Sequence, residues 1–134
     1  MDLSDFKFEL NPLVKAFQKR SCFDIEANGL LKEVSVFFCA VVEDIDNGDI
    51  RYYKPDEWQP FLDDLYSSDW IIGHNIINYD IPALHKLFGW TPNPKTVIFD
   101  TLIAARMYNP NIGRHPDCPV KVWSEHSQSW KIVG

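Results

Sequence analysis

The sequence has few of the features that define several protein classes. Its 134 residues include only three cysteines, with no C-x-x-C pair, so it shows no disulfide framework and favours a reducing cytoplasm. Cys22 and Cys39 stand in apolar runs, and we expect both to be buried core thiols. No apolar run approaches the roughly 20 residues of a membrane span. Acidic residues interrupt the N-terminus, which a secretory leader would not tolerate.

Basic residues are also in short supply. There are 13 Lys and Arg against 19 Asp and Glu, which gives a net charge of −6 at pH 7. Sequence-independent binding to duplex nucleic acid depends on Lys and Arg that displace counterions, so this charge argues against it. The charge does not exclude a nuclease, because clustered carboxylates hold metal ions that attract phosphates. The length suits one domain, and a hydrophobic content of 46% suits a real core.

Residues 1–20 differ from the rest of the chain, and we assign them to an N-terminal extension. Leu10, Leu13, Val14 and Phe17 fall on one face of a helix, which predicts a short helix docked on the domain. We assign residues 21–134 to a single, partial domain.

The periodicity of the chain after residue 20 predicts alternating strands and helices. The predicted strands span residues 22–26, 33–43, 50–54, 70–74 and 96–99, and the predicted helices 55–65, 81–88 and 100–108. The second strand is apolar on both faces, so we expect a sheet covered on both sides. The order β-β-β-α-β-α-β-α favours a mixed sheet with helices on its faces. We expect the first strand to be central in this sheet and to lie beside the fourth. The prolines and glycines that follow predict a loop.

Three acids stand at the ends of predicted elements. Asp24 and Glu26 are two apart on the first strand, so both point to one face. Asp80 follows the fourth strand and begins a helix, where backbone N–H groups favour an anion. Taken singly, D-x-E is more often a solvent-exposed strand end, and Asp80 more often a helix cap. Together the three would converge, bind Mg²⁺ or Mn²⁺, and so support water activation at a phosphodiester.

Three stretches of the chain resemble the DnaQ-like, or DEDD, 3′→5′ exonucleases. FDIEANGLL at 23–31 is similar to their first motif, GHNIINYDIPAL at 73–84 to their second, and FDTLIAARM at 99–107 to the segment that follows. The amino-acid sequence of these stretches resembles in particular the N-terminal proofreading domain of family-A DNA polymerases from short-tailed phages. The resemblance implies a ribonuclease-H-like α/β fold with a mixed five-stranded sheet flanked by helices. It also implies two-metal hydrolysis at the 3′ end of single-stranded DNA, in the infected host's cytoplasm if a phage encodes the chain.

The resemblance implies a role for individual residues. Asp24, Glu26 and Asp80 would be the catalytic residues and the ligands of Mg²⁺ or Mn²⁺. The residues implied to bind the terminal nucleotide are Asn28, Gly29, Leu30, His74, Asn75 and Tyr79. Of these, the histidine and the tyrosine are more often packing or orienting residues. Asp100 and Thr101 look like a helix cap and a support for the site.

The family's third motif, Tyr-x-x-x-Asp or His-x-x-x-x-Asp, does not follow Tyr108. The later acids Asp117 and Glu125 lack its spacing, so the chain holds only the first two motifs. A fragment, a split polymerase gene and a degraded reading frame all fit this pattern, and we expect a C-terminally truncated domain. Three functions stay open. They are an exonuclease, active weakly alone or completed by a separate polymerase chain or second protein; a nuclease-dead module that binds DNA ends or a partner protein; and an oligoribonuclease-type RNA exonuclease.

Overall fold

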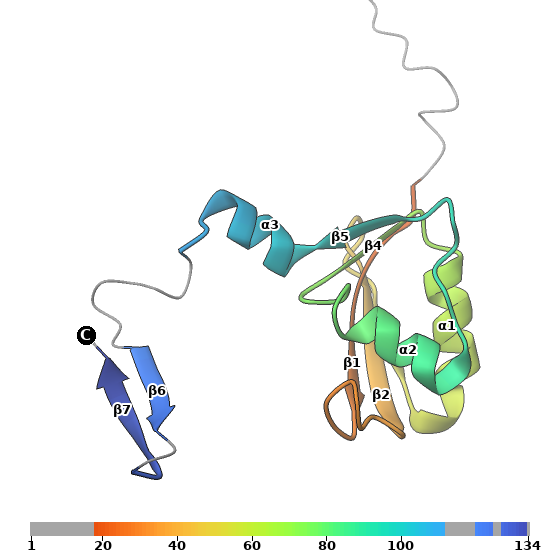
Figure 1. The fold of residues 1–134 in the computed structure, drawn as a ribbon. Coiled ribbons are helices and arrows are strands. Elements are labelled where there is room, and N and C mark those ends of the chain that lie inside the picture. The colour runs from red at the N-terminus through yellow and green to blue at the C-terminus, as the bar shows by residue number, and fades with distance from the viewer. Residues whose placement is uncertain (1–17, 112–119, 125–126, 134) are drawn as a thin grey trace, which may run out of the picture.

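The computed structural model describes residues 18–111, 120–124 and 127–133 (Figure 1). The five strands of the main sheet are β1 (Arg20–Ala27), β2 (Phe37–Asp44), β3 (Ile50–Tyr53), β4 (Trp70–Gly73) and β5 (Val97–Asp100). The helices are α1 (Trp58–Tyr66), which follows a 3₁₀ turn η2 (Pro55–Glu57), α2 (Asp80–Phe88) and α3 (Thr101–Tyr108). None of these helices has the length and apolar character that crossing a membrane requires.

The sheet has the order β3-β2-β1-β4-β5. β2 runs antiparallel to both β1 and β3, whereas β4 is parallel to β1 and β5 is parallel to β4. The first strand is therefore central and lies beside the fourth, as predicted. This confirms the ribonuclease-H-like mixed sheet flanked by helices.

The core lies between one face of the sheet and the helices α1 and α2. Phe61 of α1 is fully buried and stacks on Phe37 of β2, with ring centroids 5.8 Å apart. Trp58 covers the rim of this core by stacking on Phe88 of α2 at 4.6 Å. Two of the other buried apolar residues, Val34 and Ile76, come from the loops after β1 and β4. The rest come from the same sheet face and the same helices: Phe23, Ile25, Ala40, Val42, Leu62, Leu65, Ile71, Ala83 and Leu84. The buried side of α1 is thus an apolar stripe of Phe61, Leu62 and Leu65.

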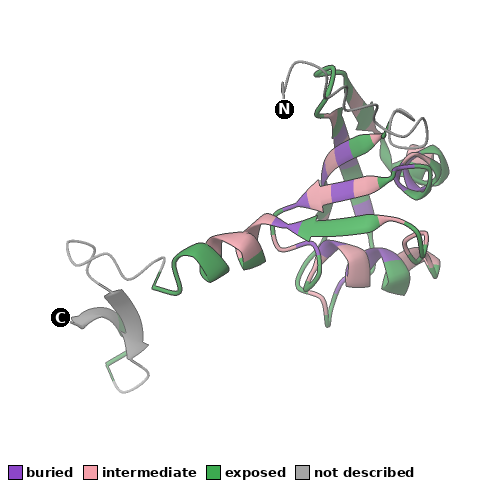
Figure 2. Cartoon of the chain, turned by 90° about the horizontal axis from the view of Figure 1, so that it is seen from above, coloured by how far each residue is buried: buried purple, intermediate pink, exposed green. Residues whose placement is uncertain are grey.

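No described helix covers the opposite face of the sheet, so the predicted cover on both faces stays a prediction. Cys39 of β2 is exposed and Cys22 of β1 only half-buried, so neither is the core thiol that we expected. A register shift at Glu26/Ala27 turns Phe37 into the core and leaves Phe38 48% exposed. Figure 2 shows the same openness in β5, which is exposed along most of its length.

The segment after Tyr108 corrects a second expectation. We predicted a loop, but Val120–Ser124 (β6) and Ser129–Val133 (β7) form an antiparallel pair in which Trp123 lies opposite Trp130. The prolines of this segment precede the pair, and its valines and tryptophans have high strand propensity. The predicted N-terminal helix and the acids at positions 117 and 125 lie outside the described residues.

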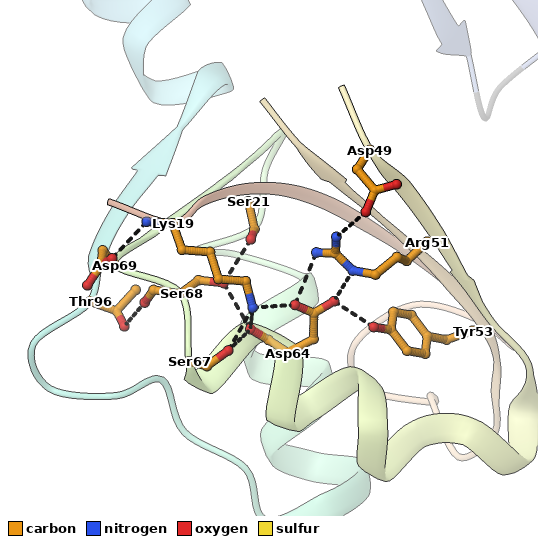
Figure 3. Close-up of polar contacts among 10 residues, drawn as sticks. All are labelled: Lys19, Ser21, Asp49, Arg51, Tyr53, Asp64, Ser67, Ser68, Asp69 and Thr96. Atoms are coloured by element: carbon orange, nitrogen blue, oxygen red, sulfur yellow. Dashed lines mark hydrogen bonds and ion pairs between the residues drawn. The ribbon is translucent and has the colours of Figure 1, made fainter. Parts of the chain in front are cut away.

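A buried carboxylate fastens α1 to the edge of the sheet (Figure 3). Asp64 accepts hydrogen bonds from Lys19 Nζ at 2.6 Å, Arg51 Nε at 2.8 Å and Tyr53 Oη at 2.6 Å. Its side chain is only 9% exposed. Burial alone would raise the pKa of Asp64, but the bonds from Arg51, Lys19 and Tyr53 outweigh burial and hold that pKa below its ordinary value. Burial and the bond to Asp64 raise the pKa of Tyr53 to about 12.

This cluster predicts an acid-labile contribution to stability. Because the pKa of Asp64 is lower in the folded chain than in the unfolded chain, its stabilisation is present above the unfolded pKa of about 4 and is lost as the pH falls through the folded pKa. We expect Asp64→Asn to lower the free energy of unfolding by about 1–3 kcal/mol at pH 7 and by much less at pH 3. The cost stays below that of a fully buried pair because Lys19 and Arg51 are 32% and 30% exposed. Urea unfolding at both pH values measures it.

The neighbouring Asp63 on the same helix provides the control. It is exposed and accepts only from Gln59 in the same helix, so Asp63→Asn should change stability by less than about 0.5 kcal/mol. Equal losses in the two variants, or an Asp64→Asn loss that is the same at both pH values, would contradict the role of this cluster.

Candidate functional site

The end of β4 is held tightly against β1. A Cβ on Gly73 would lie 2.9 Å from the carbonyl oxygen of Phe23 and closer still to the side chain of Ile76, so only glycine fits here. Ile76 itself is fully buried. The chain that leaves β4 must therefore turn beside the carboxyl half of β1, where Asp24 and Glu26 stand.

Asp100, at the end of β5, shapes the turn that follows β4. Its carboxylate accepts from the backbone N–H of Asn75 at 2.9 Å and of Ile77 at 3.0 Å. It also caps α3 by accepting from Leu102 N and Ile103 N, which confirms the predicted helix cap. Burial alone would raise the pKa of Asp100, but these four backbone bonds outweigh it and lower the pKa. The turn places Asn75 in the left-handed region, with φ of 61°.

Two further residues of the turn have defined partners. His74 Nδ1 lies 3.0 Å from Thr101 Oγ1, and that hydroxyl lies 3.3 Å from the carbonyl oxygen of Gly73. This confirms Thr101 as a support for the turn and gives His74 an orienting contact. Its participation in substrate binding stays a prediction.

Asp80 is the first residue of α2 and reaches back to β1. It is only 3% exposed. Burial, and then the charge of Asp24, raise the pKa of Asp80 to about 7, although backbone N–H groups of Asp80 and Ile25 partly oppose the shift. The carboxylate therefore lies near β1, close to the backbone of Ile25 and to Asp24. None of the ion pairs in the described part of the chain involves these three acids.

Tyr79 joins the two predicted motifs. Its hydroxyl donates to the carbonyl oxygen of Gly29 at 2.5 Å. Burial raises the pKa of Tyr79, and the charges of Asp80 and Glu26 raise it further. The ring therefore lies near both carboxylates and tethers the loop that follows β1. This is an orienting role, and a direct contact with substrate stays a prediction.

The loop after β1 is closed by Asn28. Its Oδ1 accepts from Ser35 N at 2.9 Å and Val36 N at 2.8 Å, and its Nδ2 donates to Ser35 Oγ at 2.9 Å. The side chain of Asn28 is thus used within the loop. Leu30 stands at the tip with 75% of its surface exposed. Its contact with a terminal base stays a prediction.

The structure brings the predicted acids into one neighbourhood without completing a metal site. Asp24 and Asp80 are electrostatic neighbours, and Asp80 and Glu26 are both electrostatic neighbours of Tyr79. Across residues 18–111 and the β6–β7 segments, no three His, Cys, Asp or Glu side chains are close enough together to hold a metal ion. Convergence of all three acids on one ion stays a prediction. The chemistry of the set nevertheless suits a divalent cation, because a buried carboxylate beside a second one lacks a compensating charge.

A cleft of about 400 Å³ adjoins the acids on the open face of the sheet. Its lining includes Asp24, Glu26, Cys39, Tyr52 and Lys54. We did not single out the residues of β2 and β3 from the sequence. The pairing of the strands would have identified them. Asp24 pairs with Val41, and Val41 pairs with Tyr52, so Tyr52 lies in the same row across the sheet as Asp24.

Comparison with known proteins relates the chain to phage DNA polymerases. No family model matches it. Over 98 residues it is 36% identical to the DNA-directed DNA polymerase of Enterobacteria phage T3 and 35% identical to that of Escherichia phage T7. Each alignment covers 66% of this chain but 14% of the relative, so the chain spans about one seventh of the curated relatives it matches. The predicted relation to phage DNA polymerases is thereby confirmed.

A solved structure gives a weaker likeness. The family B DNA polymerase from the hyperthermophilic archaeon Pyrobaculum calidifontis matches with a TM-score of 0.39 and 20% identity, over 88% of this chain and 15% of that one. A likeness at this level carries no argument about function.

The environment of Asp80 predicts an unusual pH dependence of stability. Its pKa is about 7 in the folded chain and about 4 in the unfolded chain, so folding favours the protonated acid. Stability should therefore fall as the pH rises from about 4 to about 7, by up to roughly 4 kcal/mol. The side chain of Asp80→Asn does not ionise, so this variant lacks that pH dependence. With a chelator present, we expect it to be more stable than the natural chain at pH 8 and equally stable at pH 4, measured by thermal and urea unfolding.

Asp100→Asn is the matched control, because Asp100 is also buried but its pKa is lowered. This variant should be less stable than the natural chain at pH 8, since it loses a charged acceptor for four backbone N–H groups. If Asp80→Asn were instead less stable than the natural chain at pH 8, the ionised Asp80 carboxylate would have a stabilising partner, and the prediction would be wrong.

Proposed function

We propose that the chain carries the metal-binding and DNA-end-binding part of a proofreading-type 3′→5′ exonuclease domain. The electrostatic proximity of Asp24, on β1, to Asp80, at the start of α2, supports this proposal. The sequence similarity to phage DNA polymerases supports it independently. The reaction is hydrolysis of the terminal phosphodiester of single-stranded DNA.

The observation that carries the proposal is the position of Asp80. A carboxylate that is 97% buried at a helix start would ordinarily receive capping N–H groups or a cationic partner, as Asp100 and Asp64 do. The backbone N–H groups of Asp80 and Ile25 only partly offset the burial of Asp80, no ion pair of the described residues involves it, and the charge of Asp24 lies nearby. Two neighbouring carboxylates without a cation are costly, and a divalent metal removes that cost.

Each residue would have a separate role in such a site. Asp24, Glu26 and Asp80 would hold Mg²⁺ or Mn²⁺, and the bound metal would supply an activated water and stabilise the leaving 3′ oxygen. Leu30, at the tip of its loop, would contact the terminal base. Tyr79 holds that loop against the acids through its bond to Gly29, so it positions the nucleotide relative to the carboxylates. Asn75, whose backbone is fixed by Asp100, would help place the terminal nucleotide.

A nuclease-dead DNA-end-binding module is the second candidate. Two observations favour it for this chain alone: no three acids in the described residues form a compact metal site, and the sequence lacks the third motif. Contacts with bases through Leu30 and aromatic side chains do not require that motif. A separate polymerase chain or second protein that supplied it would restore the exonuclease.

The proposal predicts slow, metal-dependent hydrolysis by the isolated chain. The missing motif removes a metal ligand and the group that orients or deprotonates the water, and general acid–base help alone is worth about 10²–10⁴-fold. We expect only trace release of mononucleotides from a 5′-labelled, single-stranded oligonucleotide in Mn²⁺, and none in chelator. Asp24→Ala should abolish the trace.

Asp56→Ala serves as the control, since Asp56 is an exposed acid in η2 that does not line the cleft. It should leave the trace activity unchanged. Hydrolysis that survives equally in Asp24→Ala would assign the activity to another site or to a contaminant. Oligonucleotide binding without any hydrolysis, in both metals, would favour the second candidate instead.

A further inference from the structure

The open face of the sheet is divided into two chemically different halves. Moving along β1, the side chains that point to this face are Arg20, Cys22, Asp24 and Glu26. Asp24 and Glu26 line the cleft and belong to the candidate site. The half around Cys22 is different, because β4 and β5 lie beside it and contribute apolar residues.

The pairing registers identify this apolar half. Arg20 aligns with Trp70 of β4, and Trp70 with Val97 of β5; Cys22 aligns with Ile72, and Ile72 with Phe99. Val97 and Phe99 are each 43% exposed. On the other face, Ile71 of β4 is fully buried, whereas its neighbour Ile98 on the edge strand β5 is 38% exposed. We call Trp70, Ile72, Val97 and Phe99 the apolar patch. Parallel strands ordinarily have both faces covered, so β4 and β5 lack a layer here.

The N-terminal extension reaches the domain at this patch. Lys19 N donates to Asp69 Oδ2 at 2.8 Å, and Lys19 O accepts from Asp69 N at 2.8 Å and Trp70 N at 3.1 Å. The chain is thereby fixed at the amino ends of β1 and β4, immediately before the apolar patch begins. Residues 1–17, which the structure does not describe, precede this point directly.

We propose that residues 10–17 form a helix that packs on the apolar patch. Leu10, Leu13, Val14 and Phe17 repeat at the spacing of one helical face, which is the pattern that covers a sheet. An eight-residue helix is about 12 Å long and about 10 Å wide. Strands of four residues are about 13 Å long and lie about 4.8 Å apart. A helix centred on β4 therefore covers Cys22 on one side and Phe99 on the other, and ends before Asp24.

The extension is preferred to other occupants because its attachment point and its apolar stripe both match the patch. A second copy of the chain would have to lose translational freedom to bind there, whereas the extension is already attached. The proposed helix also leaves the cleft beside Asp24 and Glu26 open, so it is compatible with DNA binding. It does not depend on the exonuclease proposal.

The two cysteines of the open face supply an internal test. Cys22 lies beside the patch, whereas Cys39 lines the cleft at the far end of the same face. One full-length parent keeps only Cys22, through Cys39→Ser and Cys118→Ser. A second parent keeps only Cys39. Each is then combined with Leu13→Asp, and the rate of modification by 5,5′-dithiobis(2-nitrobenzoate) is measured in native buffer.

We expect Leu13→Asp to speed modification of Cys22 at least about tenfold, which corresponds to losing only about 1.4 kcal/mol of docking. The rate at Cys39 should stay the same. Asn11→Asp is the matched control, because it adds the same charge outside the apolar stripe, and it should leave both rates unchanged.

Three results would overturn the proposal. The first is a Cys22 rate that is the same in the parent, Leu13→Asp and Asn11→Asp. The second is an equal acceleration of Cys22 and Cys39, which indicates a general loosening of the fold. The third is protection of Cys22 that disappears on dilution of the parent, which assigns the cover to a second copy of the chain.

Discussion

The close approach of β4 to β1 is the constraint on which the site depends. Gly73 leaves no space for a Cβ against the carbonyl oxygen of Phe23, so the two parallel strands end side by side. The following turn is then too short to move away from β1, and Asp100 fixes its backbone from β5. The first turn of α2 consequently begins beside Asp24, with Asp80 facing inward.

Two buried carboxylates show how differently the fold treats negative charge. Asp64 accepts hydrogen bonds from the side chains of Lys19, Arg51 and Tyr53. These bonds stabilise its ionised form, which holds α1 against the sheet. Asp80 receives only partial help from backbone N–H groups and faces a second acid, so its ionised form is disfavoured. A fold that gives one acid three partners and leaves the other beside Asp24 concentrates uncompensated charge at one place. Such concentrations are typical of sites that bind a cation or use a proton.

The sequence predicted the elements whose residues carry a strong local pattern. The five strands, the three helices, the helix cap at Asp100 and the central place of the first strand all followed from periodicity and order. Long-range effects escaped prediction. The register shift at Glu26/Ala27 decides that Phe37, and not Phe38, faces the core, and only the pairing reveals it. The cluster around Asp64 joins residues 45 and 13 positions away, so no local pattern announces it. The neighbourhood of Asp24 and Asp80 was predictable because the motifs follow adjacent strands.

The central claim is that the acids at the end of β1 and the start of α2 bind a divalent cation. Titration of Mn²⁺ into the full chain at pH 8, followed by electron paramagnetic resonance of the free ion, tests it most directly. We expect saturable binding that is weakened at least about tenfold in Asp24→Asn and in Asp80→Asn, and unchanged in Asp56→Asn. Equal binding by the natural chain and by both site variants would contradict it.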